Sequence, residues 1–341
     1  MKKFLVLLMT AAMLIVTGCG NDANTNSNNT GSQANSNNKL VIYTSMKESL
    51  IGGIVTGFKA KYPEIDVDYQ SAGAGKIMAK LAAERQSGHL MADIIWTSEV
   101  PDFYQMKDEG ILEQYTPTVF NELLNPFDDY DGSFTAGRLG TLGIVINTDK
   151  VATPPISWGT IANEPLYKDA FGIADPALSG TSFMSVALLE KQFGWDYIVK
   201  LKNNGAIKSK GSGRVIDDTA AGTLTACLGV DYITASKIDK GSHLAMVYPK
   251  ELLMVPSPIS IFKDADHKEI AKKFVDYVLS QEAQQKVADA GTVPVRADVK
   301  MPEKYNLPQP EDALRNGIKV NYSEVLSKKD EIVKKFSELF R

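Results

Sequence analysis

Two short segments in the second half of the chain have the residue types that bind a small anion. Ser179-Gly180-Thr181-Ser182 stands at the expected start of a helix. Free backbone N–H groups and the helix dipole favour an anion there, and the hydroxyls of Ser179, Thr181 and Ser182 could add donors. In Gly211-Ser212-Gly213-Arg214, glycines allow close backbone approach, and Arg214 offers a planar fork suited to phosphate or carboxylate. The alternatives are that Ser182 only caps its helix and that Arg214 is a solvated loop arginine.

Asp231 and Tyr232 form a second candidate feature, because they follow an expected apolar strand, Ala226 to Val230. A carboxylate at a strand end suits a ligand that carries an ammonium group or sugar hydroxyls. Its alternative role is to cap the turn that follows. With the anion segments, Asp231 predicts a bipolar ligand. Tyr232 could stack on a sugar or a cation, or could belong to the core.

Other reactive residues are not arranged for catalysis or for metal binding. Cys227 lies between apolar neighbours and is expected to be a small buried hydrophobe. His89, His243 and His267 are scattered, without metal-ligand spacing to another histidine or cysteine. The sequence also contains no nucleophile and base pair and no phosphate-binding Walker loop. We therefore expect neither an enzyme nor a protein with a metal or cofactor.

The beginning of the chain has the pattern of an export signal. Lys2 and Lys3 precede an apolar run from Phe4 to Val16 and then small residues, which predicts a signal peptide over residues 1–18. Val16-Thr17-Gly18-Cys19 further resembles the bacterial lipobox, in which the cysteine receives a lipid before cleavage. Cys19 would then be the first mature residue and would tether the protein outside the membrane. The alternative is an ordinary signal peptide with a chance cysteine.

The composition of the mature chain limits its contacts with membranes and nucleic acids. Residues 19–38 are almost all small and polar, so we expect a disordered tether. No later stretch approaches the roughly 20 apolar residues of a membrane span, so only the lipid anchor would enter the bilayer. Without residues 1–18 the chain has 35 Lys and Arg against 41 Asp and Glu, a balance of −6. This charge disfavours binding to nucleic acid.

Alternating strands and helices place several polar segments at one edge of a sheet. The expected strands 40–43, 65–69 and 93–96 are separated by helical patterns, which predicts a mainly parallel sheet flanked by helices. Thr44 and Ser45 follow the first strand, Ser71 to Gly75 the second, and Thr97 and Ser98 the third. Carboxyl ends of parallel strands are where such sheets bind ligands.

Two later apolar strands, Leu139 to Asn147 and Val255 to Phe262, bracket about 110 residues that have their own α/β rhythm. We interpret these residues as a second lobe inserted into the first. The predicted boundaries are residues 39–138 and 260–341 for lobe 1 and residues 139–259 for lobe 2. Helices are expected over 268–287 and 324–340, the last one packed on the outside.

Several motifs, taken in order, resemble the extracellular solute-binding proteins of ABC importers, in the branch that binds ferric iron, hexose phosphates or 2-aminoethylphosphonate. The motifs are Asp93-Ile94-Ile95-Trp96, Ser179-Gly180-Thr181, Tyr248-Pro249-Lys250-Glu251, Val255-Pro256-Ser257-Pro258-Ile259-Ser260-Ile261, the segment 268–284 and Gly291-Thr292-Val293-Pro294-Val295-Arg296-Ala297-Asp298-Val299. The similarity covers nearly the whole mature chain.

This resemblance implies the type II periplasmic-binding-protein fold, an α/β fold of two lobes joined by two hinge-crossing strands with the ligand between them. It also implies a small anionic or zwitterionic solute, ABC permease subunits as partners, and an extracytoplasmic location, and we expect a monomer. The expected ligand-binding residues are Thr44, Ser45, Ala72, Gly73, Ser98, Ser179, Gly180, Thr181, Ser182, Ser212, Arg214, Asp231 and Tyr232.

The resemblance also bears on which solute is expected. Iron-binding relatives carry consecutive tyrosines where this chain has Asp231 and Tyr232, so ferric iron is the alternative and a phosphorylated or phosphonate solute is preferred. 2-Aminoethylphosphonate would place its phosphonate at Ser179 to Ser182 and its ammonium at Asp231. A hexose phosphate would donate hydroxyls to Asp231. An extracellular hydrolase and an adhesive or sensory lipoprotein are the other classes considered.

Overall fold

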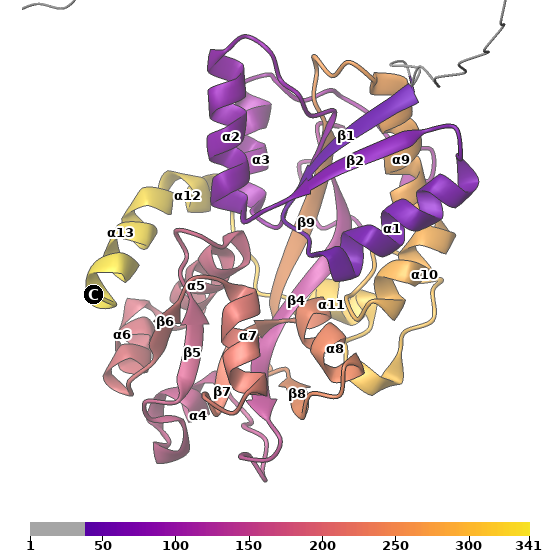
Figure 1. Ribbon diagram of the computed structural model, residues 1–341. Helices are drawn as coiled ribbons and strands as arrows, with labels where there is room; N and C mark the ends of the chain where they lie inside the picture. Colours follow the sequence, from indigo (N-terminus) through magenta and orange to yellow (C-terminus); the bar gives the residue numbers. More distant parts are fainter. Residues whose placement is uncertain (1–37) are drawn as a thin grey trace, which may run out of the picture. The chain divides into compact units, whose positions relative to one another are not determined.

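The fold of residues 38–341, which the computed structural model describes, is organised around two long strands. They are β4 (Thr135–Asn147) and β9 (Leu253–Ile261), and every residue in both is buried. They pair antiparallel, from Thr135 opposite Ile259 to Leu142 opposite Leu253, with an irregularity between Ala136 and Leu139. Figure 1 shows both strands running from the elements around β1 to those around β7. The predicted signal peptide, the lipidation at Cys19 and residues 19–37 of the predicted tether lie outside the described residues.

The first lobe is built from three short strands and the helices that flank them. The strands follow the sheet order β2-β1-β3-β9-β4, with β1 parallel to β2 and β3, and β3 antiparallel to β9. Leu40 and Ile42 of β1 are fully buried against the helices. The strands are β1 (Lys39–Thr44), β2 (Asp66–Ser71) and β3 (Ile94–Trp96), and the helices are α1 (Glu48–Lys61), α2 (Ala74–Gln86), α3 (Val100–Asp108), α9 (Lys268–Leu279) and α10 (Gln281–Asp289).

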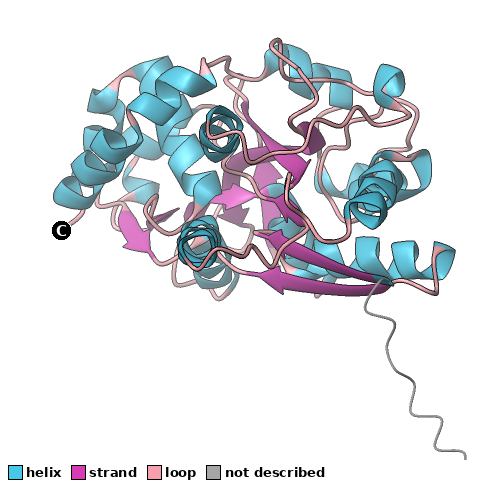
Figure 2. Cartoon of the chain, turned by 90° about the horizontal axis from the view of Figure 1, so that it is seen from above, coloured by secondary structure: helices cyan, strands magenta, loops and turns pink. Residues whose placement is uncertain are grey.

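The second lobe continues the same sheet in the order β4-β7-β5-β6. Strand β7 is antiparallel to β4 and parallel to β5, and β8 pairs separately with β4. Cys227 in β7 is fully buried, as its apolar neighbours predict. Figure 2 shows helices on both sides of the strands. The elements are α4 (Trp158–Asn163), β5 (Phe171–Ala174), α5 (Gly180–Phe193), α6 (Trp195–Asn203), β6 (Ile207–Ser209), α7 (Ser212–Ala220), β7 (Ala226–Val230), α8 (Asp231–Asp239) and β8 (Leu244–Val247).

The C-terminal helices run along the outside from one lobe to the other. Helix α12 packs on α3 of the first lobe, and α13 packs on α5 of the second (Figure 1). The lobe boundaries given above stay a prediction, because the crossing strands take part in both lobes. The remaining helices are α11 (Pro310–Asn316), α12 (Tyr322–Ser327), α13 (Lys329–Leu339) and the 3₁₀ turns Phe120–Glu122, Pro165–Tyr167 and Glu303–Tyr305.

Two segments that the sequence predicts as single helices are each divided in two. The segment 268–287 is interrupted at Ser280, whose backbone is extended and whose hydroxyl accepts a hydrogen bond from Ala283 N. The segment 324–340 is interrupted at Lys328. An apolar stripe that continues across such a break does not reveal it, so the pattern predicts the buried face but not the interruption. In the part of the chain that the structure describes, no helix is sufficiently long and apolar to cross a bilayer.

Close packing of α1 against α9 and α10 yields a test of the fold. A Cβ atom at Gly57 would lie 2.0 Å from Tyr277 Oη, whereas one at Gly53 would meet no atom within 4 Å. Gly57→Ala should lower the free energy of unfolding by about 1–3 kcal/mol through overpacking. Gly53→Ala, the matched control in the same helix, should raise it by about 0.5–1 kcal/mol through helix propensity. Urea unfolding measures both, and equal effects would contradict this packing.

Candidate functional site

The main candidate site is a cavity of about 750 Å³ lined by residues of both lobes, here called the interlobe cavity. The first lobe contributes the loops after β1 and β2 and the start of α2, and the second contributes the starts of α5 and α7. The lobes touch beside it, because a Cβ atom at Gly73 would lie 2.7 Å from the carbonyl oxygen of Leu178. The volume is in the range of small-molecule sites, about 300–1,000 Å³.

Three hydroxyl groups meet where α5 and α7 begin. Ser179 Oγ lies 3.1 Å from Thr181 Oγ1 and 3.0 Å from Ser212 Oγ, and Thr181 Oγ1 lies 3.0 Å from Ser212 Oγ. Ser179 also caps α5 by accepting a hydrogen bond from Ser182 N. The two anion segments of the sequence, whose Ser179 and Ser212 are 33 positions apart, therefore form one cluster of hydroxyl groups.

The charges along the cavity are positive. Lys47, Lys76, Lys210, Arg138 and Arg214 line it, and among residues 38–341 no Asp or Glu does. Arg214 pairs with Asp218 at 2.9 Å. Within the same described range, none of the three lysines has an ion pair, so their charge is available to a ligand. A site with this lining attracts anions.

Arg138 of β4 forms the floor of the cavity and is only 1% exposed. Its Nη1 donates to Thr292 Oγ1 at 2.8 Å and to Asp231 Oδ1 at 3.3 Å, and its Nη2 donates to Ser98 Oγ at 3.2 Å. Its Nε is buried and has no hydrogen-bond partner among the described residues. The guanidinium also lies 5.0 Å from the centroid of the Tyr232 ring. The sequence analysis did not predict this residue as part of the site. The available signal was an arginine within an otherwise apolar strand, where a charged side chain needs a partner.

The structure corrects the expected role of Asp231, which does not line the cavity and is buried. Its Oδ1 accepts from Tyr232 N at 2.7 Å and from Arg138, and its Oδ2 accepts from Thr141 N at 2.8 Å and Thr292 Oγ1 at 2.5 Å. Both carboxylate oxygens are therefore used by protein donors. Asp231 accepts a hydrogen bond from the backbone at the start of α8, and its negative charge balances the positive charge of Arg138. The first of these contacts resembles the capping role that the sequence left open.

Two other expected ligand contacts also face the protein interior. Thr44 Oγ1 donates to the carbonyl of Trp96 at 2.8 Å, and Ser182 Oγ donates to the carbonyl of Ala174 at 2.5 Å. Both are satisfied inside their own lobe. The remaining expected residues line the cavity: Ser45, Ala72, Gly73, Ser98, Ser179, Gly180, Thr181, Ser212, Arg214 and Tyr232. The three lysines were missed, because single exposed lysines give no local signal.

Tyr232 bridges the cavity wall and the loop after β1. Its Oη accepts a hydrogen bond from Lys47 N at 3.0 Å, which joins the second lobe to the first. Burial raises the pKa of Tyr232 above the ordinary value, so the phenol is neutral. A neutral phenol presents a ring and a hydroxyl group to a ligand, and it adds no negative charge to the site.

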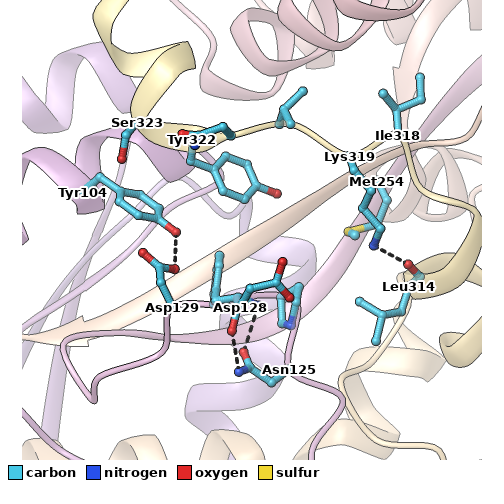
Figure 3. A pocket seen from close by; sticks show the side chains of 14 residues that line it. Tyr104, Asn125, Asp128, Asp129, Met254, Leu314, Ile318, Lys319, Tyr322 and Ser323 are labelled. Carbon is cyan, nitrogen blue, oxygen red and sulfur yellow. Dashed lines mark hydrogen bonds between the residues drawn. The ribbon is translucent and has the colours of Figure 1, made fainter.

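A second cavity, of about 510 Å³, lies between the loop around Asp129, the start of β9 and the segment before α12. Figure 3 shows Tyr104, whose Oη donates to Asp129 Oδ1 at 2.7 Å, and Asp128 beside it. Lys319 Nζ is directed away from these carboxylates and donates to the carbonyl of Leu314 at 2.6 Å. This cavity contains none of the expected site residues, and its carboxylates do not suit an anion.

Comparison with known proteins also indicates a protein that binds a solute. The family described as bacterial extracellular solute-binding protein matches residues 90–324. The chain is 24% identical over 247 residues to the putative 2-aminoethylphosphonate-binding periplasmic protein of Salmonella typhimurium. The aligned region covers 69% of this chain and 71% of that protein.

Two solved structures illustrate the similarity in fold. The periplasmic binding protein AfuA from Actinobacillus pleuropneumoniae, with fructose-6-phosphate bound, has a TM-score of 0.78 and 22% identity, over 89% of this chain and 98% of that chain. Iron-bound HitA from Pseudomonas aeruginosa has a TM-score of 0.73 and 19% identity, over 87% and 99%. These similarities confirm the predicted α/β fold of two lobes.

The buried pair of Arg138 and Asp231 yields a second test. Asp231→Ala leaves a buried guanidinium without its counter-charge and should lower the free energy of unfolding by about 3–5 kcal/mol. Asp218→Ala breaks the exposed pair with Arg214 and should cost only about 0.5 kcal/mol. Chemical unfolding of both variants compares the two pairs, and a similar small cost would show that the Asp231 pair is not structural.

Proposed function

The chain belongs to the family of bacterial extracellular solute-binding proteins, and we propose that its interlobe cavity captures a small phosphorylated or phosphonate organic solute. As a substrate-binding component of an ABC importer, it would deliver this solute to the permease subunits in the membrane. The observation that carries the proposal is the lining of the cavity. Cations and hydroxyl groups come from both lobes, and no Asp or Glu of residues 38–341 lines it.

The position of the charges suggests how an anion favours the closed form. Lys47 and Lys76 belong to the first lobe, and Lys210 and Arg214 belong to the second. When the lobes approach, these like charges repel one another. A phosphoryl group between them supplies the counter-charge and accepts hydrogen bonds from Ser179, Thr181 and Ser212. Because the anion interacts with both lobes only when they are closed, it shifts the population toward the closed form.

Within this class, the lining favours a sugar phosphate over 2-aminoethylphosphonate. The ammonium group was expected at Asp231, whose carboxylate is used by Arg138 and by backbone and threonine donors. Hydroxyl groups of a sugar could instead contact Ser45, Ser98 and Tyr232, which line the cavity. The likeness in sequence to a putative 2-aminoethylphosphonate-binding protein supports the phosphonate as the second candidate.

Ferric iron is the alternative ligand, supported by the fold similarity to iron-bound HitA. Ferric iron needs hard anionic oxygen ligands. The described lining supplies one tyrosine, Tyr232, whose pKa is raised by burial, and residues 38–341 hold no group of three or more His, Cys, Asp or Glu able to bind a metal. The lining therefore fits a phosphoryl group better.

We also propose that Cys19 carries the lipid that anchors the mature protein at the outer face of the membrane. The support is the segment Val16-Thr17-Gly18-Cys19 after an apolar run. Labelled palmitate should be incorporated into the wild-type protein when it is expressed in its host, and not into Cys19→Ala. The variant should also be released from the membrane fraction. Equal labelling of both proteins would refute the anchor.

The proposed solute class is tested by calorimetric titration with fructose 6-phosphate, 2-aminoethylphosphonate and phosphoglycerate. At least one should bind, and should stabilise the fold by about 2.7 kcal/mol at 100 times its Kd. Thr181→Ala and Ser212→Ala should each weaken binding about tenfold, because each removes a donor to a charged group. Ser323→Ala, which removes a hydroxyl from the second cavity, is the matched control and should leave the Kd unchanged.

Two results would contradict this proposal. One is the absence of any stabilisation by all three compounds. It is measured as the change in the unfolding temperature when each compound is added to the dialysed protein. The other is a visible absorption band after addition of a ferric salt, which would show phenolate coordination and favour the iron-binding alternative.

A further inference from the structure

Two buried carboxylates and one partly exposed lysine form a cluster behind the start of α5. Glu99 precedes α3, Asp102 lies in its first turn, and Lys329 begins α13. Lys329 Nζ contacts Glu99 Oε1 and lies 2.6 Å from Asp102 Oδ1. Glu99 is 4% exposed and Asp102 is 1% exposed. Two buried carboxylates therefore share one ammonium group, which leaves an excess of negative charge when both are ionised.

The excess charge is placed beside the expected anion site. A Cβ atom at Gly180, the first residue of α5, would lie 2.7 Å from Glu99 Oε2. Gly180 lines the interlobe cavity together with Ser179 and Thr181. Glu99 itself does not line it. The carboxylate is thus separated from the cavity by one residue, close enough to interact with an anion electrostatically without touching it.

The surroundings of Glu99 offer little to balance this charge. The charged groups that face it are Asp102 from α3 and Lys329 from α13. Helix α5 contributes Gly180 to the contact, and this residue does not titrate; Ala74 of α2, which does not titrate either, lies beside the same glycine. Asp102 Oδ2 is buried without a hydrogen-bond partner among the described residues. An unpaired buried carboxylate oxygen is unfavourable, so a proton is the simplest way to neutralise the cluster.

The pKa directions agree with this geometry. Burial, and then repulsion by Asp102, raise the pKa of Glu99 to about 7, against the opposing effect of Lys329. Burial also raises the pKa of Asp102. The cluster therefore exchanges one proton near neutral pH, whereas an exposed glutamate would be fully ionised there.

We propose that Glu99 is a positioning residue that couples solute capture to uptake of a proton. This inference rests on the proposed function. An anion held at the start of α5 repels ionised Glu99 and so favours its protonated form. By reciprocity, protonation of Glu99 strengthens binding of the anion. The protein would then hold its solute more tightly in an acidic medium than in an alkaline one.

The test measures the Kd of fructose 6-phosphate from pH 5.5 to pH 8.5 for the wild type and Glu99→Gln. The glutamine mimics protonated Glu99 and leaves Asp102 to pair with Lys329. Glu99→Gln should bind about tenfold more tightly than the wild type at pH 8.5 and equally at pH 5.5. Ionisation of the phosphate cancels in the ratio of the two Kd values. Glu64→Gln, at an exposed site, is the matched control and should follow the wild type throughout.

Unfolding of the free protein provides a second readout. The pKa of Glu99 is higher in the folded than in the unfolded state, so the stability it contributes is complete below about pH 4.5 and is lost as the pH rises through about 7. Glu99→Gln should therefore unfold at higher urea concentration than the wild type above pH 7, and the difference should vanish near pH 5.

The possible results separate this inference from the proposed function. Parallel pH profiles of Kd, with binding intact, would overturn the role of Glu99 and leave the solute class standing. Absence of binding by fructose 6-phosphate, 2-aminoethylphosphonate and phosphoglycerate would overturn both. Equal pH dependence of unfolding in wild type and Glu99→Gln would show that Glu99 holds no proton near neutral pH, and would also refute the inference.

Discussion

The pairing of β4 with β9 is the constraint on which the other parts of the structure depend. These two strands are shared by both lobes, since β9 also pairs with β3, and β4 also pairs with β7 and β8. Because both strands are buried along their whole length, they fix where the polar ends of the other strands meet. In the proposed function, each lobe would turn about this pair of strands. A hinge of this kind allows closure while both lobes keep their cores.

The distribution of charge around the cavity matters more than the net charge of the protein. The chain as a whole is slightly acidic, with a formal charge of −4. Its interlobe cavity is nevertheless lined by lysine and arginine, while Asp231, Glu99 and Asp102 lie buried behind the lining. Low-dielectric walls focus such local fields, so an acidic protein can attract an anion to one site. The net charge of the whole chain therefore carries no information about this cavity.

Arg138 and Asp231 show how the site is kept rigid. Arg138 comes from a crossing strand and contacts Ser98 after β3, Thr292 after α10 and Asp231 at the start of α8. These residues belong to elements that are far apart in the sequence, and their hydrogen bonds hold the floor of the cavity in one arrangement. A buried pair of this kind adds little net stability, but its hydrogen bonds specify geometry. The cluster of Glu99, Asp102 and Lys329 also joins distant elements, because it links α13 to α3. It differs in that two carboxylates share one ammonium group, so the cluster has a net negative charge when both are ionised.

The sequence by itself determined the α/β alternation, the two crossing strands and the helix start that carries Ser179, because these depend on local periodicity and on residues that cap helices. It did not predict the helix that begins at Ser212. Most of the ligand-binding residues expected from the sequence line the cavity, although they make up less than half of its lining. The sequence did not determine that Asp231 faces Arg138 instead of the cavity, since these residues are 93 positions apart and only the pairing of β4 with β7 brings them together. It also did not show that Lys329 pairs with the buried carboxylates of Glu99 and Asp102, which requires α13 to return to α3. Local patterns fix where a chain bends and which face it buries, whereas the partner of a buried charge is decided by contacts between distant segments.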